Sequence, residues 1–284
     1  MKYRDVLWNT LNSHLTVPTP QGQHAITAMQ QVMTYPLTEG YPIITERDIS
    51  SSWRKAIGEL CAFINGATTS KEIAKFGCDW WGPWTSDKKT AKRGIESGSL
   101  GPASYGGAFR HFPTPSGNKE GFDQFSNLVE QIRKYPTVRT HFITPWIPYW
   151  QVRGLEKSTI APCHGWVHVR IINGEIHLHM FQRSGDVPIG VPHNMVQYSA
   201  LIIMLSQLTG YRPGVYYHTV SDAHIYEDQI PACDEMLFRK DRKLPWIHLN
   251  HDGYKVTDIH EFRAEHFELR NYNPHPSIRI PVSV

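Results

Sequence analysis

Apolar residues recur at helical spacing in four parts of the chain. In the second of these, Trp53, Ile57 and Leu60 fall on one face, and Glu59 lies beside that face. The last part is the most clearly apolar. The predicted helices are residues 1–15, 51–65, 123–134 and 195–209.

Short runs typical of β-strands dominate the second half of the chain. Two of them flank Asn173-Gly174, a dipeptide that strongly favours a two-residue hairpin turn. The predicted strands are 141–144, 166–172, 175–181, 215–220 and 245–249, with a further strand-like stretch that ends at Thr45.

Two segments read as loops. Residues 17–24, VPTPQGQH, contain two prolines and a glycine, and residues 77–122 are irregular and rich in Gly, Pro and Trp. A loop region as long as the second favours a functional role. Since no repeat, low-complexity segment or linker divides the chain, we predict one α+β domain over residues 1–284.

The composition is that of an ordinary globular enzyme, with 40% hydrophobic and 19% charged residues among 284. The net charge is +3 with His neutral, and the cations are scattered, so we expect recognition of a small anion rather than of nucleic acid. The chain shows neither an apolar signal core near its start nor an apolar run long enough to cross a bilayer. We therefore expect no membrane partner and a reduced, cytoplasmic protein.

Metal binding is not expected. The four cysteines, Cys61, Cys78, Cys163 and Cys233, form no CxxC pair, which argues against zinc. His177 and His179 alternate as a metal pair would, but the sequence places no third ligand beside them.

Cys163 stands in APCHGWV, immediately before a predicted strand and next to His164. A cysteine at a strand edge can be an exposed nucleophile if a nearby positive charge stabilises its thiolate. Cysteine is also among the most buried residue types, so an inert core cysteine is the alternative from this fragment.

Several other polar residues allow two interpretations each. Arg183 and Ser184 in QRSGD offer a guanidinium fork and a hydroxyl to a phosphate, or form an ordinary turn, and Asp186 can accept from an amino-heterocycle. Asn194 precedes an apolar helix and can cap it or pair with a base edge. His224 and Tyr226 share one face of a strand and can hold a sugar hydroxyl or be half-buried packing residues.

The order of these blocks carries a resemblance. A helix with Glu-Leu is followed by a Trp-rich loop, SLGPASYG, a Pro-x-x-Arg, and then PCH, QRSGDVPIGVPHN and HTVSDAHIY. From about Gly40 to Val284 the chain resembles thymidylate synthases, and the last three blocks are the specific part. The resemblance implies a mixed β-sheet covered by helices and a homodimer packed sheet to sheet.

The resemblance also implies a chemistry. Cys163 would add to C6 of a pyrimidine nucleoside monophosphate, and C5 would then take a one-carbon unit from 5,10-methylenetetrahydrofolate. Arg183 would lower the thiol pKa and bind phosphate, Glu59 would organise proton transfer, and Tyr105 would lie near the C5 proton.

The remaining roles follow from the same resemblance. Asn194 would read uracil, His224 and Tyr226 would hold the ribose 3′-hydroxyl, and Arg139 would reach the phosphate of the partner chain. The implied folate contacts are Arg47, Trp81, Trp84, Asp186, Gly190 and, at the end of a closing tail, Val284.

Three departures from the family pattern matter. The first phosphate loop has no arginine, so Gln21, Gln23 or His24 would serve instead. SLGPASYG is one residue longer than usual, and His193 stands where the family usually has Phe. A polar residue there can hold a water, and its ordinary pKa near 6.5 suits a general base.

These departures favour a dUMP hydroxymethylase, in which water attacks the 5-methylene intermediate. The retained tryptophans and tail favour the alternative, an ordinary thymidylate synthase that makes dTMP and dihydrofolate. A CMP or dCMP hydroxymethylase stays open, although Asn194 argues for uracil. A regulatory, nucleotide-binding pseudoenzyme is the alternative of another class, and the retention of Cys163, Glu59 and Arg183 argues against it.

Overall fold

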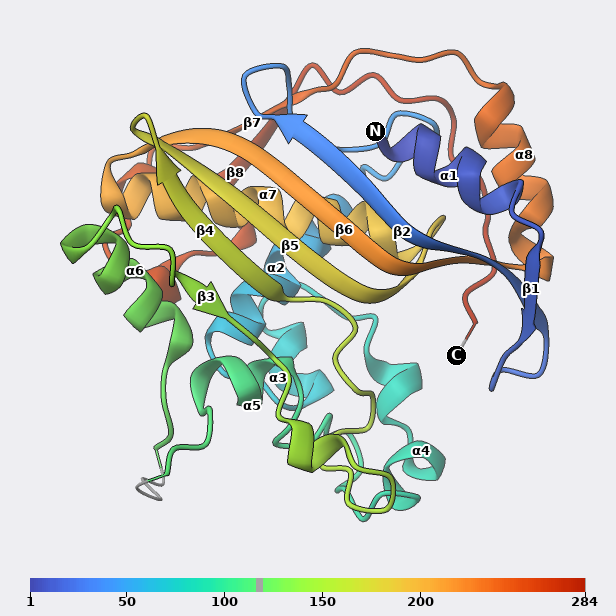
Figure 1. Cartoon of the computed structure of the whole chain (residues 1–284), viewed down its shortest axis with the longest axis horizontal. Coiled ribbons are helices and arrows are strands. Elements are labelled where there is room, and N and C mark those ends of the chain that lie inside the picture. The colour runs from blue at the N-terminus through green and yellow to red at the C-terminus, as the bar shows by residue number, and fades with distance from the viewer. Residues whose placement is uncertain (116–119, 284) are drawn as a thin grey trace.

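A six-stranded mixed sheet forms the frame of the protein (Figure 1). The computed structural model describes residues 1–115 and 120–283. The strand order is β1-β2-β6-β5-β4-β3, and every neighbouring pair is antiparallel except β5 and β6, which are parallel. The strands are β1 (Leu15–Pro18), β2 (His24–Pro36), β3 (Phe142–Ile143), β4 (Trp166–Ile172), β5 (Glu175–Asp186) and β6 (Arg212–Tyr226).

The predicted hairpin between β4 and β5 is present. Asn173 and Gly174 both have positive φ, 52° and 75°, as a two-residue turn of this kind requires, and Ile172 pairs with Glu175. The parallel pair β5–β6 needs a crossover, which α7 (Gly190–Thr209) supplies. This helix ends at Gly210, whose φ of 77° gives the left-handed C-cap that glycine adopts most readily.

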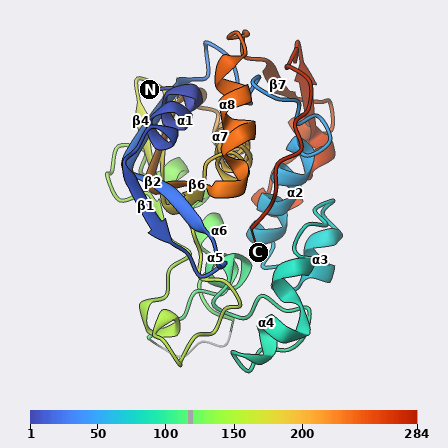
Figure 2. The ribbon, with the colours of Figure 1, turned by 90° about the vertical axis from the view of Figure 1, so that its right-hand side faces the viewer.

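Helices cover one face of the sheet. Helix α7 packs on β5 and β6, and α2 (Trp53–Ile64) packs on α7 from the outside. In Figure 2 the strands lie on one side of α7 and α2 lies on the other. Because α7 is enclosed between the two layers, most of its residues are buried, which explains its nearly continuous apolar sequence. Helices α5 (Tyr105–Arg110) and α6 (Gln124–Lys134) extend this layer.

The opposite face of the sheet carries exposed and half-buried side chains. Along β5, Ile176, Leu178 and Met180 are fully buried, while the alternate residues His179 and Phe181 are exposed. Other large exposed apolar side chains in the sheet are Met29, Phe142 and Ile172.

The remaining elements differ more from the sequence predictions. The first helix ends at Leu11, and the predicted loop 17–24 begins inside β1. The predicted loop 77–122 contains two short helices, of which one is α5. A short helix before this loop, and one helix and one strand near the C-terminus, were not predicted. These further elements are α1 (Tyr3–Leu11), α3 (Ser70–Ala74), α4 (Asp87–Ala91), α8 (Ile230–Phe238) and a two-stranded sheet of β7 (Trp246–Leu249) and β8 (Phe267–Arg270). Across residues 1–115 and 120–283, no helix is long and apolar enough to span a bilayer.

Candidate active site

Cys163 lies in the segment that leads into β4, beside the side chain of Arg183 on β5. Arg183 Nη2 is 3.3 Å from the Cys163 Sγ, and the guanidinium is held by the carbonyl oxygens of Pro162 at 2.8 Å and Ala161 at 2.9 Å. The side chain of Cys163 is half-buried, whereas the other three cysteines, Cys61, Cys78 and Cys233, are buried. Accessibility and a fixed cation thus coincide at one cysteine, as the sequence predicts for a nucleophile.

Two opposing effects act on the Cys163 thiol. Burial raises the pKa of Cys163, while the Arg183 guanidinium and the Tyr105 hydroxyl lower it, and burial is the larger effect. Arg183 thus acts in the direction that the resemblance implies, but the pKa of the Cys163 thiol stays above its ordinary value.

Tyr105, the first residue of α5, is tied directly to the cysteine. Its hydroxyl oxygen accepts the Cys163 backbone N–H at 2.7 Å, and its ring stacks on His164 at 4.4 Å. Gly106 allows this helix to approach its neighbour, since a Cβ there would lie 2.0 Å from the Ala67 carbonyl oxygen. The helix therefore places a phenol beside Cys163.

Glu59 is a buried carboxylate on α2 with three strong donors around it. Trp80 and Trp81 donate their indole N–H groups to Oε1, and Gln197 donates to Oε2. Burial raises the pKa of Glu59 above its usual value, and these hydrogen bonds oppose that shift. A carboxyl group whose pKa is raised in this way suits proton transfer near neutral pH.

Asn194 is buried on α7 and does not cap it. The helix begins at Gly190, four residues before Asn194, so both the predicted start at residue 195 and the N-cap interpretation are wrong. The Asn194 Nδ2 donates to Gln197 Oε1 at 2.9 Å, and its Oδ1 accepts from Gln182 Nε2 at 3.0 Å.

The parallel pairing of β5 with β6 brings the remaining polar candidates together. Ser184 pairs with Asp222, and Asp186 pairs with His224. The Ser184 hydroxyl donates to Asp222 Oδ2 at 3.0 Å, and His224 Nδ1 lies 3.5 Å from the same carboxylate. The rings of His224 and Tyr226 are in contact at 5.3 Å, as expected for residues on one strand face.

Asp186 is bound within the protein itself. The Gln229 side chain donates to its Oδ2 at 2.9 Å and the Ile189 N–H donates to its Oδ1 at 3.0 Å. Burial raises the pKa of Asp186 to about 6. This carboxyl group therefore organises the turn before α7.

His193 differs from the sequence-based expectation. Its Nδ1 donates to the Ile189 carbonyl oxygen at 2.7 Å, so its Nε2 carries the lone pair and accepts from the Ser52 hydroxyl at 2.9 Å. Burial lowers the pKa of His193 to about 4. The argument from a free imidazole with a pKa near 6.5 is therefore wrong, because a ring with a pKa of about 4 is a weak base and both its nitrogens are engaged.

Arg139 is exposed, unlike the buried and half-buried residues around Cys163. It precedes β3 and its side chain is exposed, while its carbonyl oxygen is 3.0 Å from His168 Nε2 on β4. The chain itself does not bury Arg139 near Cys163, which leaves it available to another molecule.

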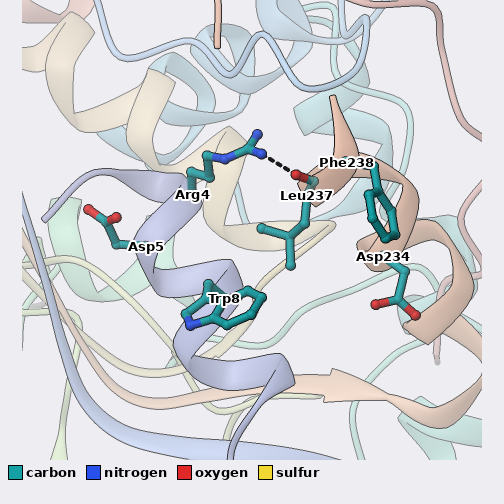
Figure 3. Close-up of a pocket in the computed structure, with 6 residues that line it drawn as sticks. All are labelled: Arg4, Asp5, Trp8, Asp234, Leu237 and Phe238. Carbon is teal, nitrogen blue, oxygen red and sulfur yellow. Dashed lines mark hydrogen bonds between the residues drawn. The ribbon is translucent and has the colours of Figure 1, made fainter. Parts of the chain in front are cut away.

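A surface hollow of the protein lies away from Cys163. A cavity of about 340 Å³ between α1 and α8 is lined by Arg4, Asp5, Trp8, Asp234, Leu237 and Phe238 (Figure 3). Arg4 in this hollow donates to the Leu237 carbonyl, which stabilises the end of α8. None of the predicted site residues lines it, so the chemistry around Cys163 identifies the site better than the size of the hollow.

The order of the site residues along the chain also matches a known family. The thymidylate synthase profile matches residues 1–284. The chain belongs to the thymidylate synthase family. Membership implies an enzyme that transfers a one-carbon unit to a pyrimidine, with 5,10-methylenetetrahydrofolate as co-substrate. The resemblance and the mixed α+β fold are thereby confirmed.

The residues that the resemblance assigns to folate have side chains whose chemistry fits a flat, anionic ligand. Arg47 is only 8% exposed and donates to the Pro188 carbonyl oxygen at 2.7 Å, and its Nε is buried without a partner among the described residues. The rings of Trp81 and Trp84 lie 6.0 Å apart. A partly satisfied cation and neighbouring indoles suit a flat, anionic ligand. Gly190 begins α7, and Val284 lies outside the described residues.

The C-terminal tail is docked against the rest of the chain. Gln229 Nε2 donates to the Pro281 carbonyl oxygen at 3.0 Å, and Gln23 Nε2 donates to Ser283 Oγ at 2.7 Å. Gln23 belongs to the turn that lacks the family's arginine. The tail and this turn are thus in contact.

Sequence reasoning missed three polar residues of the site: Gln197, Ser52 and Asp222. Gln197 is fully buried and interrupts an apolar helix, which is a readable signal. Asp222 stands in the HTVSDAHIY block, which is a readable signal, whereas Ser52 gave none, since serine is common at helix starts. In the described part of the chain, no group of three His, Cys, Asp or Glu side chains is arranged for a metal.

Proposed function

We propose that the protein is a dUMP hydroxymethylase, which uses 5,10-methylenetetrahydrofolate to convert dUMP into 5-hydroxymethyl-dUMP. The observation that carries the choice of product is the hydrogen-bonded pair Ser52–His193, which puts polar groups where the family usually has a Phe ring. Bound 5,10-methylenetetrahydrofolate would supply the one-carbon unit, held by Arg47, Trp81 and Trp84.

The first step belongs to Cys163. Its thiolate forms a bond to C6 of the pyrimidine, and Arg183, 3.3 Å from the Sγ, stabilises the thiolate and attracts the phosphate. Ser184, His224 and Tyr226 lie together at the ends of β5 and β6 and offer hydroxyl and imidazole groups to phosphate and sugar.

Glu59 and Asn194 act on the base. The Asn194 amide, buried and fixed at both ends, keeps one N–H and one lone pair for a base edge. Glu59, with its raised pKa, transfers protons as charge moves onto the base carbonyl. Tyr105, whose oxygen already accepts from the Cys163 N–H, keeps a second lone pair to hold the water that takes the proton from C5.

The product is decided after the nucleotide carries an exocyclic methylene at C5. A water held by the Ser52 oxygen forms the new C–O bond to the methylene carbon and releases its proton to bulk water. The electron pair that reaches C5 re-forms the C5–C6 double bond as the Cys163 thiolate leaves C6. Because the pKa of His193 is about 4, the ring stays neutral and its Nε2 keeps the Ser52 hydroxyl oriented.

The enzyme works as a homodimer joined through the open sheet face. Exposed Phe142, Ile172 and Phe181 on that face need a cover, and two copies of the same face provide one. Exposed Arg139 lies next to this face and would reach the phosphate of the partner. Its charge, with Gln23 and His24, replaces the missing first-loop arginine.

The ordinary thymidylate synthase is the second candidate. The docked tail and the Trp81–Trp84 contact favour it, because a closed, dry site promotes hydride transfer. Incubation of the enzyme with dUMP and 5,10-methylenetetrahydrofolate, followed by mass spectrometry of the nucleotide, separates the two. We expect 5-hydroxymethyl-dUMP without dihydrofolate. Stoichiometric dTMP and dihydrofolate would identify a synthase, and faster turnover of dCMP or CMP would show that the base is cytosine.

A further inference from the structure

Gln197 bridges the two buried side chains that act on the base. Its Nε2 donates to Glu59 Oε2, and its Oε1 accepts from Asn194 Nδ2 at 2.9 Å. On its other side, Asn194 Oδ1 accepts from Gln182 Nε2 at 3.0 Å. Gln197 is fully buried, and Gln182, Glu59 and Asn194 are 2%, 5% and 6% exposed, so water cannot easily replace these bonds.

The direction of every donor in this chain is fixed from both ends. Asn194 Oδ1 accepts from Gln182, so Asn194 Nδ2 donates to the Gln197 oxygen, and the NH₂ group of Gln197 then faces Glu59 Oε2, which accepts when the carboxyl group is ionised. Gln182 Nε2 also donates to the Ser184 carbonyl oxygen at 3.0 Å, so its NH₂ group is fixed as well. Asn194 therefore meets an acceptor at Gln197 and a donor at Gln182.

We propose that Gln197 is a positioning residue that holds the Asn194 amide in one of its two orientations and so prevents uracil and cytosine from being exchanged. Uracil offers a donor at N3 and an acceptor at O4, and cytosine offers the reverse pattern at N3 and N4. Asn194 can match the second pattern only by a half-turn of its amide. After this rotation the Asn194 oxygen would face the Gln197 oxygen, and the Asn194 NH₂ group would face the Gln182 NH₂ group, so both hydrogen bonds would be lost.

This inference rests on the proposed role of Asn194, which is to recognise the base. The hydrogen bonds that restrain the Asn194 amide lie within the protein, so they can be tested without a ligand. Loss of one of the two restraints should reduce the preference between the bases about tenfold, since a buried polar group left unpaired is costly. Gln197 also supports Glu59, so turnover would mix two effects, and binding is the cleaner measurement.

The test is the variant Gln197→Met, which keeps the length of the side chain and removes both polar ends. Calorimetry should give a ratio of the Kd for dCMP to the Kd for dUMP about tenfold smaller than in the wild type. Gln207→Met is the matched control, because Gln207 lies on the same helix and donates instead to the Tyr254 carbonyl oxygen at 2.8 Å. Its ratio should equal that of the wild type. An unchanged ratio in a folded Gln197→Met protein would overturn the proposal.

A second measurement needs no nucleotide. Hydrogen exchange of the Asn194 side-chain amide, followed by NMR, should become at least about tenfold faster in Gln197→Met, and unchanged exchange would also overturn the proposal. If that variant does not fold, Gln182→Met removes the other restraint and should give the same two changes. A wild type that prefers dCMP would refute the proposed substrate, but a narrowed preference in Gln197→Met would still support the positioning role.

Discussion

Ser52 donates its hydroxyl hydrogen to the Nε2 of His193 although Ser52 stands at the N-cap of α2. A serine there usually accepts a backbone N–H of the first turn, and no such cap bond is present. The lost cap costs about 1 kcal/mol of helix stability. A residue that forgoes local stabilisation to serve a neighbouring side chain is characteristic of functional sites.

His193→Phe should reduce the yield of 5-hydroxymethyl-dUMP at least about tenfold and raise the share of dTMP, because an apolar ring neither orders Ser52 nor holds water. Ser52→Ala should shift the products in the same direction. His248→Phe, a change on exposed strand β7, serves as the control. Nucleotide products are measured by mass spectrometry after equal turnover. An unchanged product ratio in both site variants would show that the pair only supports the fold.

Acid should destabilise the protein well above the pH at which most carboxylates titrate. Burial lowers the pKa values of His164 and His218 to about 3 and that of His193 to about 4, below the usual 6.5. Below about pH 6.5 the unfolded chain binds protons that the folded protein rejects, so stability falls with pH. Asp186, whose pKa is raised to about 6, acts in the opposite direction.

The net loss between about pH 7 and pH 5 should be about 2–4 kcal/mol of unfolding free energy, because the three strongly shifted histidines outweigh Asp186 and the other groups whose pKa values are raised, Glu46, Glu59, His224 and His260. Urea unfolding at the two pH values measures it. Equal stability at both would mean that these rings are not kept neutral in the folded protein.

Cys163→Ala should abolish turnover and leave the fold intact, because the thiolate forms the bond to C6 and Cys163 is the only cysteine that is not buried. Cys233→Ala, at a buried position on α8, should keep activity. Incubation of the wild type with 5-fluoro-dUMP and folate should give an adduct that peptide mass spectrometry places on Cys163. An adduct on another cysteine would refute the assignment.

Arg139→Ala should be inactive alone and should recover activity when mixed with inactive Cys163→Ala. Each hybrid dimer then contains one site with both an intact cysteine and the partner's arginine, so about a quarter to a half of its capacity returns. Activity after mixing, with subunit exchange shown by native mass spectrometry, is the measurement. A monomeric wild type, or exchange without recovery, would contradict the shared site.

The parts of the fold that follow from local signals were predictable. Asn173-Gly174 fixes the β4–β5 hairpin, and the apolar pattern from Trp53 fixes α2. The start of α7 was predicted five residues late, because a glycine and two prolines before Asn194 read as a loop, whereas Pro192 fits the first turn of a helix. Helix α8 follows β6 without a clear apolar period, and its pairing with α1 is a tertiary effect.

The candidate site was predictable residue by residue but not as a network. Cys163, Arg183 and Glu59 follow from a family pattern, and the structure places Arg183 and Tyr105 on the cysteine. The bridge through Gln197 and the bond between Ser52 and His193 depend on which side chains face each other across α2 and α7, and sequence spacing does not contain that information. The shift in the pKa of His193 follows from the same packing.

The exposed side chains of β4 and β5 bear on how the specific activity depends on the protein concentration. If a site needs Arg139 from a second copy, dilution removes activity faster than it removes protein, and specific activity rises with concentration until pairing saturates. The melting temperature should then also rise with concentration. The amount of polypeptide would itself become a control on nucleotide output, with no effector required.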